Sequence, residues 1–277
     1  MPMNLNSINF GDLTEGLIER AGLDARSGSI VRRRFGLGSS ETATLQELGA
    51  KYSVTRERVR QLEAQAISEI RKSAEALTEA ADILEFTRGY LNDAGGVRKD
   101  DILVKEFHLM SASDEEESVF GNRLRFIFEV VNYPFFSGES EDYHDFWYVD
   151  ENIVGKLASI HEDLLKKLKK VEHFSEILRE VIGPHGIKEP AAVNLLTVSK
   201  KIGVGPYGDI GLSHWEEINP KTVRAKAFLL LKKNDRPMHF TEIAESIASH
   251  APTVHNELIK DPRFELVSRG TYALKLK

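Results

Sequence analysis

Four polar side chains in the first quarter of the chain are spaced to share one face of a helix: Arg56, Glu57, Arg60 and Gln61. Arginine can bind the O6/N7 edge of guanine, glutamine the N6/N7 edge of adenine, and glutamate can accept a hydrogen bond from cytosine N4. The opposite face carries apolar residues at the helical period, namely Val59, Leu62, Ala66 and Ile70. The stretch therefore has the chemistry to read base edges in a DNA groove. The alternative interpretation is a solvated helix face with charge pairs one turn apart.

A shorter helix and a turn precede this stretch. The segment TLQELG (44–49) predicts the short helix, and the polar break at 50–53 predicts the turn. Thr55 is a suitable N-cap for the second helix. Two helices joined in this way predict a helix-turn-helix, which inserts the start of its second helix into the major groove.

The motifs VTRERVRQLE (54–63), TLQELG (44–49) and RRRFGLG (32–38) resemble region 4 of the housekeeping-type sigma factors of bacterial RNA polymerase. The resemblance spans about 30–72 and implies a domain that reads promoter DNA and docks on the polymerase flap. It further implies that four residues contact bases and that Thr55 contacts a phosphate. The base-contacting positions fall on Arg56, Glu57, Arg60 and Gln61. We expect nearby arginines, Arg34 and Arg58, to hold phosphates as well.

Two features depart from the sigma-factor pattern. The segment before the match lacks the usual acidic and basic start of the first helix, and about two hundred residues follow the match. No stretch resembles the region that melts promoters. We therefore expect a protein related to sigma factors but not a complete sigma factor.

Charge is distributed unevenly along the chain. The net charge of the whole chain is −6. Residues 26–72 carry 10 basic and 5 acidic side chains, and residues 222–277 carry 10 and 6, whereas residues 73–221 carry 16 and 28. Because charges are screened over about 10 Å at moderate salt, local sign governs contact with DNA. Both basic segments could bind DNA, and the acidic middle should avoid it or bind another partner.

Composition argues against several classes of protein. The chain has no cysteine, which removes disulfides, thiolate zinc sites and cysteine nucleophiles. There is no long apolar run and no signal-peptide pattern, so we expect a cytoplasmic protein without a membrane span. The glycines at 203–208 lack a phosphate-loop setting, the histidines are scattered, and the acidic run 114–117 reads as a solvated loop. We expect no enzyme activity, no cofactor and no metal site.

The acidic middle of the chain predicts further winged-helix units. Helical patterns followed by two β-prone segments, 133–136 and 145–149, predict a winged-helix-like unit over 74–150. We expect the recognition helix to run on through 73–92 into this unit. The segments HFSEILREVI (173–182) and HFTEIAESIA (239–248) indicate an internal repeat. The first copy predicts a degenerate winged-helix unit with a connector at 151–221, and the equivalent His173 and His239 suggest a structural role.

The last segment, 222–277, predicts the cleaner copy of the repeat. Its alternation over 264–275 around Arg269-Gly270 predicts a hairpin wing. The fragments MHFTEIAESI and TVHNELIKDPRFELVSRGTYAL resemble the HARE-type winged helix, a module of the delta subunit of bacterial RNA polymerase, of chromatin factors and of some restriction systems. The resemblance implies the fold and a candidate DNA surface, made of Thr253, His255, Asn256 and the wing residue Arg269.

The sequence thus predicts a mainly α protein with small β-hairpin wings, in which a helix-turn-helix domain (1–73) is followed by tandem winged-helix units. We expect it to bind double-stranded DNA with a sequence bias, as a transcription regulator, with RNA polymerase as a further candidate partner. One alternative is an adaptor that binds polymerase or another protein without reading bases. Another is the DNA-recognition subunit of a restriction or phage-defence system. The sequence leaves the oligomeric state open.

Overall fold

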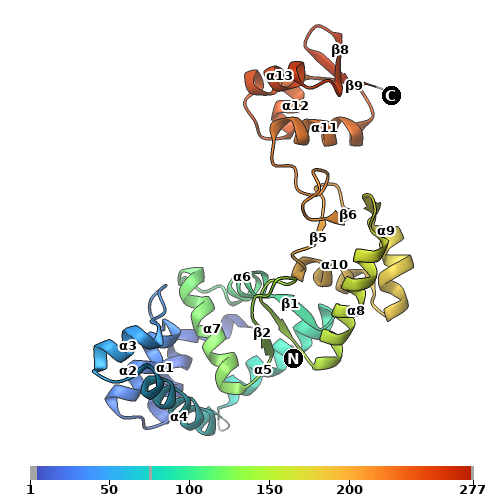
Figure 1. The fold of residues 1–277 in the computed structure, drawn as a ribbon. Helices are drawn as coiled ribbons and strands as arrows, with labels where there is room; N and C mark the ends of the chain where they lie inside the picture. Colours follow the sequence, from blue (N-terminus) through green and yellow to red (C-terminus); the bar gives the residue numbers. More distant parts are fainter. Residues whose placement is uncertain (1–4, 75–76, 276–277) are drawn as a thin grey trace. The chain divides into compact units, whose positions relative to one another are not determined.

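The computed structural model describes residues 5–74 and 77–275 (Figure 1). The chain divides into two compact units, of which the first is Met1–Ser140 with His144–Gly155 and the second is Glu141–Tyr143 with Lys156–Lys277. Among the described residues, we find no helix long and apolar enough to cross a membrane.

The first unit begins with a helical region that contains the helix-turn-helix. A short 3₁₀ turn at Leu5–Ser7 leads into four helices: α1 (Phe10–Arg20), α2 (Ala25–Phe35), α3 (Leu45–Tyr52) and α4 (Arg56–Ala74). Helices α3 and α4 form the predicted helix-turn-helix. A small core of their own, made of Ile30, Leu48 and Val59, joins α2, α3 and α4.

The rest of the first unit has the element order of a winged helix. It comprises α5 (Thr78–Asp93), β1 (Val97–Lys99), α6 (Asp100–Ser111), α7 (Glu117–Val131), β2 (Phe135–Ser137) and β3 (Phe146–Tyr148). The strands form an antiparallel sheet in the order β1-β3-β2. Strands β2 and β3 are the hairpin predicted from 133–136 and 145–149.

Helix α7 is the centre of the first unit. It packs against α1, α2 and α4 on one side and against α5 and α6 on the other. One hydrophobic core runs from Leu5 in the 3₁₀ turn, through Ile70 of α4, to Phe128 of α7 and Trp147 of the hairpin. The helix-turn-helix region and the first winged helix are therefore a single packed body.

The predicted continuation of the recognition helix into 73–92 is wrong as a single helix. Helix α4 ends at Ala74 and α5 begins at Thr78, after Leu77 in an extended conformation (φ −100°, ψ 120°). Residues 75 and 76, which that prediction included, lie outside the described residues. The reason is tertiary, because α4 and α5 both pack against α7.

The second unit contains the same order of elements twice. Helix α8 (Glu151–Lys167) begins in the first unit and continues into the second. The first copy continues with β4 (Glu172–His173), α9 (Phe174–Ile177), a π-helical turn (Leu178–Ile182), a 3₁₀ turn (Gly183–His185), α10 (Glu189–Val198), β5 (Ile202–Val204) and β6 (Asp209–Leu212). The second copy consists of α11 (Val223–Asn234), β7 (Met238–His239), α12 (Phe240–Ser246), α13 (Ala251–Lys260), β8 (Phe264–Ser268) and β9 (Thr271–Leu274).

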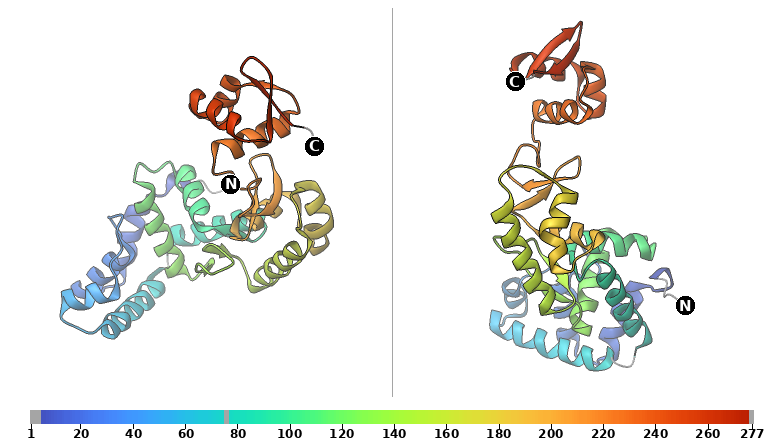
Figure 2. Two further views of the ribbon diagram at one scale, coloured as in Figure 1. Left: turned by 45° about the horizontal axis from the view of Figure 1, so that its top comes forward. Right: turned by 90° about the vertical axis from the view of Figure 1, so that its right-hand side faces the viewer.

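Both copies form antiparallel sheets with the strand order of the first winged helix. The orders are β4-β6-β5 and β7-β9-β8. In the last copy the hairpin β8–β9 follows the three helices, as two further views show (Figure 2). The hairpin predicted over 264–275 is thus present, and its turn is Arg269-Gly270.

The two copies in the second unit also share a histidine N-cap, His173 before α9 and His239 before α12. Nδ1 of His173 accepts a hydrogen bond from the backbone N–H of Ser175 at 3.3 Å, and it lies 2.7 Å from the Ser175 hydroxyl. Nδ1 of His239 has the same relation to Thr241, at 3.4 and 2.7 Å. Each histidine therefore caps the second helix of its copy. The structural role predicted for this pair is confirmed.

The predicted fold class is confirmed, since the chain is mostly helical, with a helix-turn-helix and winged-helix-like units that carry small hairpins. The division into four domains at 1–73, 74–150, 151–221 and 222–277 stays a prediction.

The helix-turn-helix depends on a close approach at Gly49. A Cβ atom at this position would lie 2.8 Å from the carbonyl oxygen of Val54, inside van der Waals contact with backbone. We expect Gly49→Ala to lower the free energy of unfolding of this region by about 1–3 kcal/mol, because the turn must open. Hydrogen exchange of the amides in α3 and α4 measures this loss.

Gly16→Ala in α1 is the matched control. A Cβ there meets nothing within 4 Å, so the substitution should stabilise its helix by about 0.5–1 kcal/mol. Exchange rates in α3 and α4 that are the same for Gly49→Ala and the natural protein would contradict the packing described here.

Candidate nucleic-acid interface

The turn between α3 and α4 is held by backbone contacts. The Val54 N–H donates to the Gly49 carbonyl at 2.9 Å, and Ser53 adopts the left-handed conformation (φ 57°) that ends α3. Thr44 and Glu47 form a capping box at the start of α3. The hydrogen bonds from Thr44 lower the pKa of the Glu47 carboxyl.

Thr55 starts α4. Its hydroxyl oxygen accepts a hydrogen bond from the backbone N–H of Arg58 at 3.1 Å. This is the N-cap that the sequence predicts for the second helix. The cap fixes where the helix begins, and so it fixes which side chains occupy the first two turns.

The first two turns of α4 present the predicted base-contacting residues to solvent. Helix α4 buries its other face against the rest of the first unit, through residues that include Val59, Ala66 and Ile70. The six predicted side chains of this segment are all exposed: Thr55, Arg56, Glu57, Arg58, Arg60 and Gln61. We refer to these six residues as the α4 patch. The structure places them together on one free surface.

Within the α4 patch the charged groups pair with one another. The Arg60 guanidinium donates two hydrogen bonds to the Glu57 carboxylate, at 2.9 and 2.7 Å. This contact lowers the pKa of Glu57. The Gln61 amide lies 3.4 Å from Glu57 and accepts from Arg58 at 3.3 Å. Because the Arg60 and Glu57 side chains are 60% and 57% exposed, water competes for the pair, and a partner can open it at little cost.

Arg34 differs from the other predicted contacts. Its Nη1 donates to the Ala43 carbonyl at 3.2 Å, and its Nε lies 3.4 Å from the Glu63 carboxylate of α4. Burial raises the pKa of Glu63 although Arg34 opposes the shift. Arg34 thus fastens the end of α2 to α4. Its phosphate contact stays a prediction, and its guanidinium already contacts Ala43 and Glu63.

The second predicted surface lies on the last winged helix. Thr253 and Asn256 are exposed on α13, and Arg269 is exposed at the turn of the β8–β9 hairpin. His255 is half-buried, with Nδ1 3.0 Å from the Tyr272 hydroxyl and its ring centroid 4.7 Å from that of Phe240. It therefore supports the packing of α13 on the hairpin, and its predicted DNA contact stays a prediction.

Two cationic residues near the turn were missed by the sequence reasoning. The Arg26 guanidinium lies 5.4 Å from the centre of the Tyr52 ring and donates to the Tyr52 carbonyl at 2.9 Å. The Lys51 ammonium lies 5.8 Å from the same ring and is exposed. Tyr52 within the predicted turn was the available signal, because aromatic rings attract cations. Both add positive charge at the turn before Thr55.

Comparison with known proteins identifies the helix-turn-helix region. Residues 21–72 match the family model of sigma-70, region 4. The RNA polymerase principal sigma factor HrdD of Streptomyces coelicolor is 42% identical over 52 residues. Those residues are 19% of this chain and 16% of that protein, so the chain spans a small part of the relative's length. The match begins nine residues before the predicted start at Ile30, and it includes all of α2 and α3.

Because Arg34 contacts other residues of the domain, we expect its removal to lower stability more than the removal of a residue of the α4 patch. Arg34→Ala should lower the free energy of unfolding of the helix-turn-helix by about 1–3 kcal/mol, because Glu63 and the Ala43 carbonyl lose their partner. Arg58→Ala removes an exposed side chain and should change it by less than about 0.5 kcal/mol. Amide hydrogen exchange in α2 and α4 checks both.

Glu63→Gln in the Arg34→Ala chain is the control. It removes the half-buried charge and should recover part of the lost stability. Equal exchange rates for Arg34→Ala and Arg58→Ala would contradict the structural role of Arg34.

Proposed function

We propose that this chain binds double-stranded DNA with a sequence bias, as a transcription regulator related to sigma factors. The α4 patch carries the proposal: six exposed residues at the start of a capped helix, behind a tight turn, in a segment that matches sigma-70 region 4. In helix-turn-helix proteins this part of the second helix enters the major groove.

In the proposed complex some residues of the α4 patch contact bases and others contact phosphates. Arg60 would pair with guanine and Gln61 with adenine, after the Glu57–Arg60 pair opens, and Glu57 would accept from cytosine. Thr55, Arg58 and Lys51, which lies in the last turn of α3, would contact phosphates. Arg56 completes the base-contacting set.

The last winged helix is the second proposed DNA contact. Residues 222–277 carry 10 basic and 6 acidic side chains. We propose a HARE-type domain here that uses Thr253 and Asn256 of α13 and Arg269 of the hairpin. The first winged helix offers no equivalent surface, because its third helix, α7, is buried by the helix-turn-helix region.

RNA polymerase is the second proposed partner, since the matched relative is named as an RNA polymerase sigma factor. Purified polymerase and the full chain should elute together in size-exclusion chromatography. Separate elution at micromolar concentrations of both would remove polymerase from the proposal.

Arg60 gives the sharpest test of base reading. Selection from a randomised duplex library with the full chain should first yield a preferred site. On single-base variants of that site, Arg60→Ala should lower affinity about 10- to 100-fold and remove discrimination at one base pair, because one bidentate contact is lost. Fluorescence anisotropy with labelled duplexes measures both effects.

Ser68→Ala is the matched control, because Ser68 is exposed on the same helix two turns further on. It should bind like the natural chain. A loss for Arg60→Ala that is equal on every duplex, with discrimination intact, would show that Arg60 contacts backbone and not a base.

Arg269 tests the contact from the last winged helix. Arg269→Ala should weaken binding to selected and unrelated duplexes by the same factor, and should reduce the slope of log affinity against log salt by about one. The reason is that a wing arginine meets phosphates, which carry no base information. Leu266→Ala, an exposed uncharged change on the same hairpin, is the control. An unchanged slope for Arg269→Ala would remove this unit from the DNA interface.

A further inference from the structure

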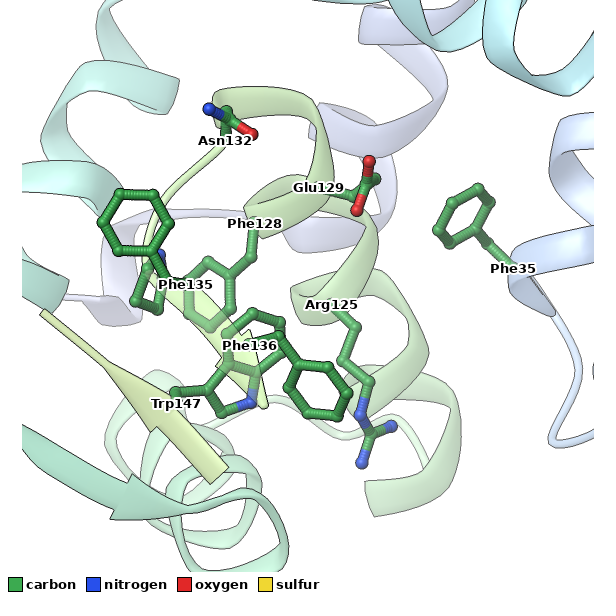
Figure 3. A pocket seen from close by; sticks show the side chains of 9 residues that line it. Phe35, Arg125, Phe128, Glu129, Asn132, Phe135, Phe136 and Trp147 are labelled. Carbon is green, nitrogen blue, oxygen red and sulfur yellow. The ribbon is translucent and has the colours of Figure 1, made fainter. Parts of the chain in front are cut away.

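The first winged helix carries a surface that the DNA-binding proposal leaves unused. An open pocket of about 450 Å³ lies in the first unit along α7, between the end of α2 and the β2–β3 hairpin (Figure 3). Its lining is mainly aromatic, with Phe35, Phe128, Phe135, Phe136 and Trp147. We refer to this site as the aromatic pocket. Its volume falls in the range of about 300–1,000 Å³ that suits ligand sites.

The floor of the aromatic pocket is held in place by a buried carboxylate. Oδ1 of Asp100 accepts from the Trp147 indole N–H at 2.7 Å, and the same carboxylate binds the Arg125 guanidinium at 3.1 and 2.5 Å. Asp100 is 5% exposed. The indole therefore has a fixed orientation, and the positive charge of Arg125 at the pocket edge is already neutralised.

The rim of the pocket leaves aromatic surface in water. Phe135 is 41% exposed and Phe136 is 48% exposed on the short strand β2. The Phe136 ring lies over Trp147, with centroids 4.7 Å apart (Figure 3). Two neighbouring phenylalanines exposed beside an open pocket are typical of an interaction site.

Charge indicates which partner this surface fits. Residues 73–150 carry 6 basic and 18 acidic side chains, so the acidic excess of the chain's middle lies in this winged helix. The wing residues that belong to the first unit, 132–140 and 144–149, include two acidic residues, Glu139 and Asp145, and no lysine or arginine. The other two acidic residues of the segment, Glu141 and Asp142, belong to the second unit, where both pair with Lys201. A wing of this composition repels phosphates and attracts cations, and its exposed rings can also bind cations over their faces.

We propose that the aromatic pocket docks a lysine- or arginine-rich protein segment that inserts one bulky apolar side chain. The apolar side chain would fill the pocket against Phe128 and Trp147. Its basic neighbours would meet the acidic wing and Glu129 at the rim, where they would replace Arg71, whose guanidinium lies 3.8 Å from that carboxylate. This contact is separate from the α4 patch, so the chain would join DNA on one surface to a cationic protein on another.

The experiment selects peptides from a random 12-residue display library on the full chain. A second selection on the Phe135→Ala/Phe136→Ala chain removes sequences that do not need the pocket. The expected winners carry one bulky apolar residue flanked by lysine or arginine, and bind the natural chain at least about tenfold more tightly than the double variant. Leu109→Ala/Met110→Ala, which truncates exposed aliphatic side chains of α6, should bind as the natural chain does.

The fluorescence of Trp147 measures peptide binding independently, in a chain whose pocket is intact. The chain has two tryptophans, so Trp215→Phe leaves Trp147 as the only tryptophan, which can be excited apart from the tyrosines. Saturable change of its emission with the selected peptide supports the proposal. Winners that are acidic or lack an apolar residue, or that bind the double variant equally, would overturn it. So would an emission change produced by single-stranded oligothymidylate but by no basic peptide, since the pocket would then hold nucleic acid.

Discussion

The burial of helix α7 is the constraint on which the first unit depends. All of α7 lies within the described residues, and along it only Glu117 and Glu129 are exposed. Its end is secured from α4, since the Arg71 guanidinium donates to the carbonyls of Val130 and Glu129 at 3.0 and 2.8 Å. Near its start, Arg123 donates to the Thr14 hydroxyl of α1 at 2.7 Å. Because α7 is enclosed by protein, the third helix of this winged helix cannot enter a groove, and α4 instead has its inner face fixed and its first turns free.

This arrangement separates two kinds of surface on one packed body. The start of α4 belongs to a segment with 10 basic and 5 acidic side chains, and the winged helix that supports it carries 6 and 18. Because charges are screened over about 10 Å at moderate salt, a partner at each surface is attracted or repelled mainly by the charges of that surface. In the proposed complex, the acidic winged helix would also repel DNA that approached its own surface and not the start of α4. The aromatic pocket is lined mostly by residues of the acidic winged helix, with Phe35 contributed by the basic segment.

Local features of this fold could be read from the sequence. Thr55 as a cap, the 264–275 hairpin and the paired histidines 173 and 239 each depend on residues close together in the chain. The turn predicted at 50–53 is displaced, because α3 continues to Tyr52 and the turn lies at 53–55. Non-local features could not be read in this way. Arg34 lies 3.4 Å from the Glu63 carboxylate, 29 positions further along the chain, and nothing in the sequence indicates that these two residues pair. The extended residue Leu77, before α5, lies in a stretch without proline or glycine, and α4 and α5 both pack against α7. Which helices cover α7 is likewise a non-local feature.

In the proposed complex the α4 patch, and not the first winged helix, faces DNA. Photo-crosslinking tests it most directly, with a photoreactive amino acid placed in the full chain either at position 61 or at position 136 and a duplex chosen by library selection. We expect a cross-link from position 61 to a defined base and none from position 136. A cross-link from position 136 together with none from position 61 would contradict it.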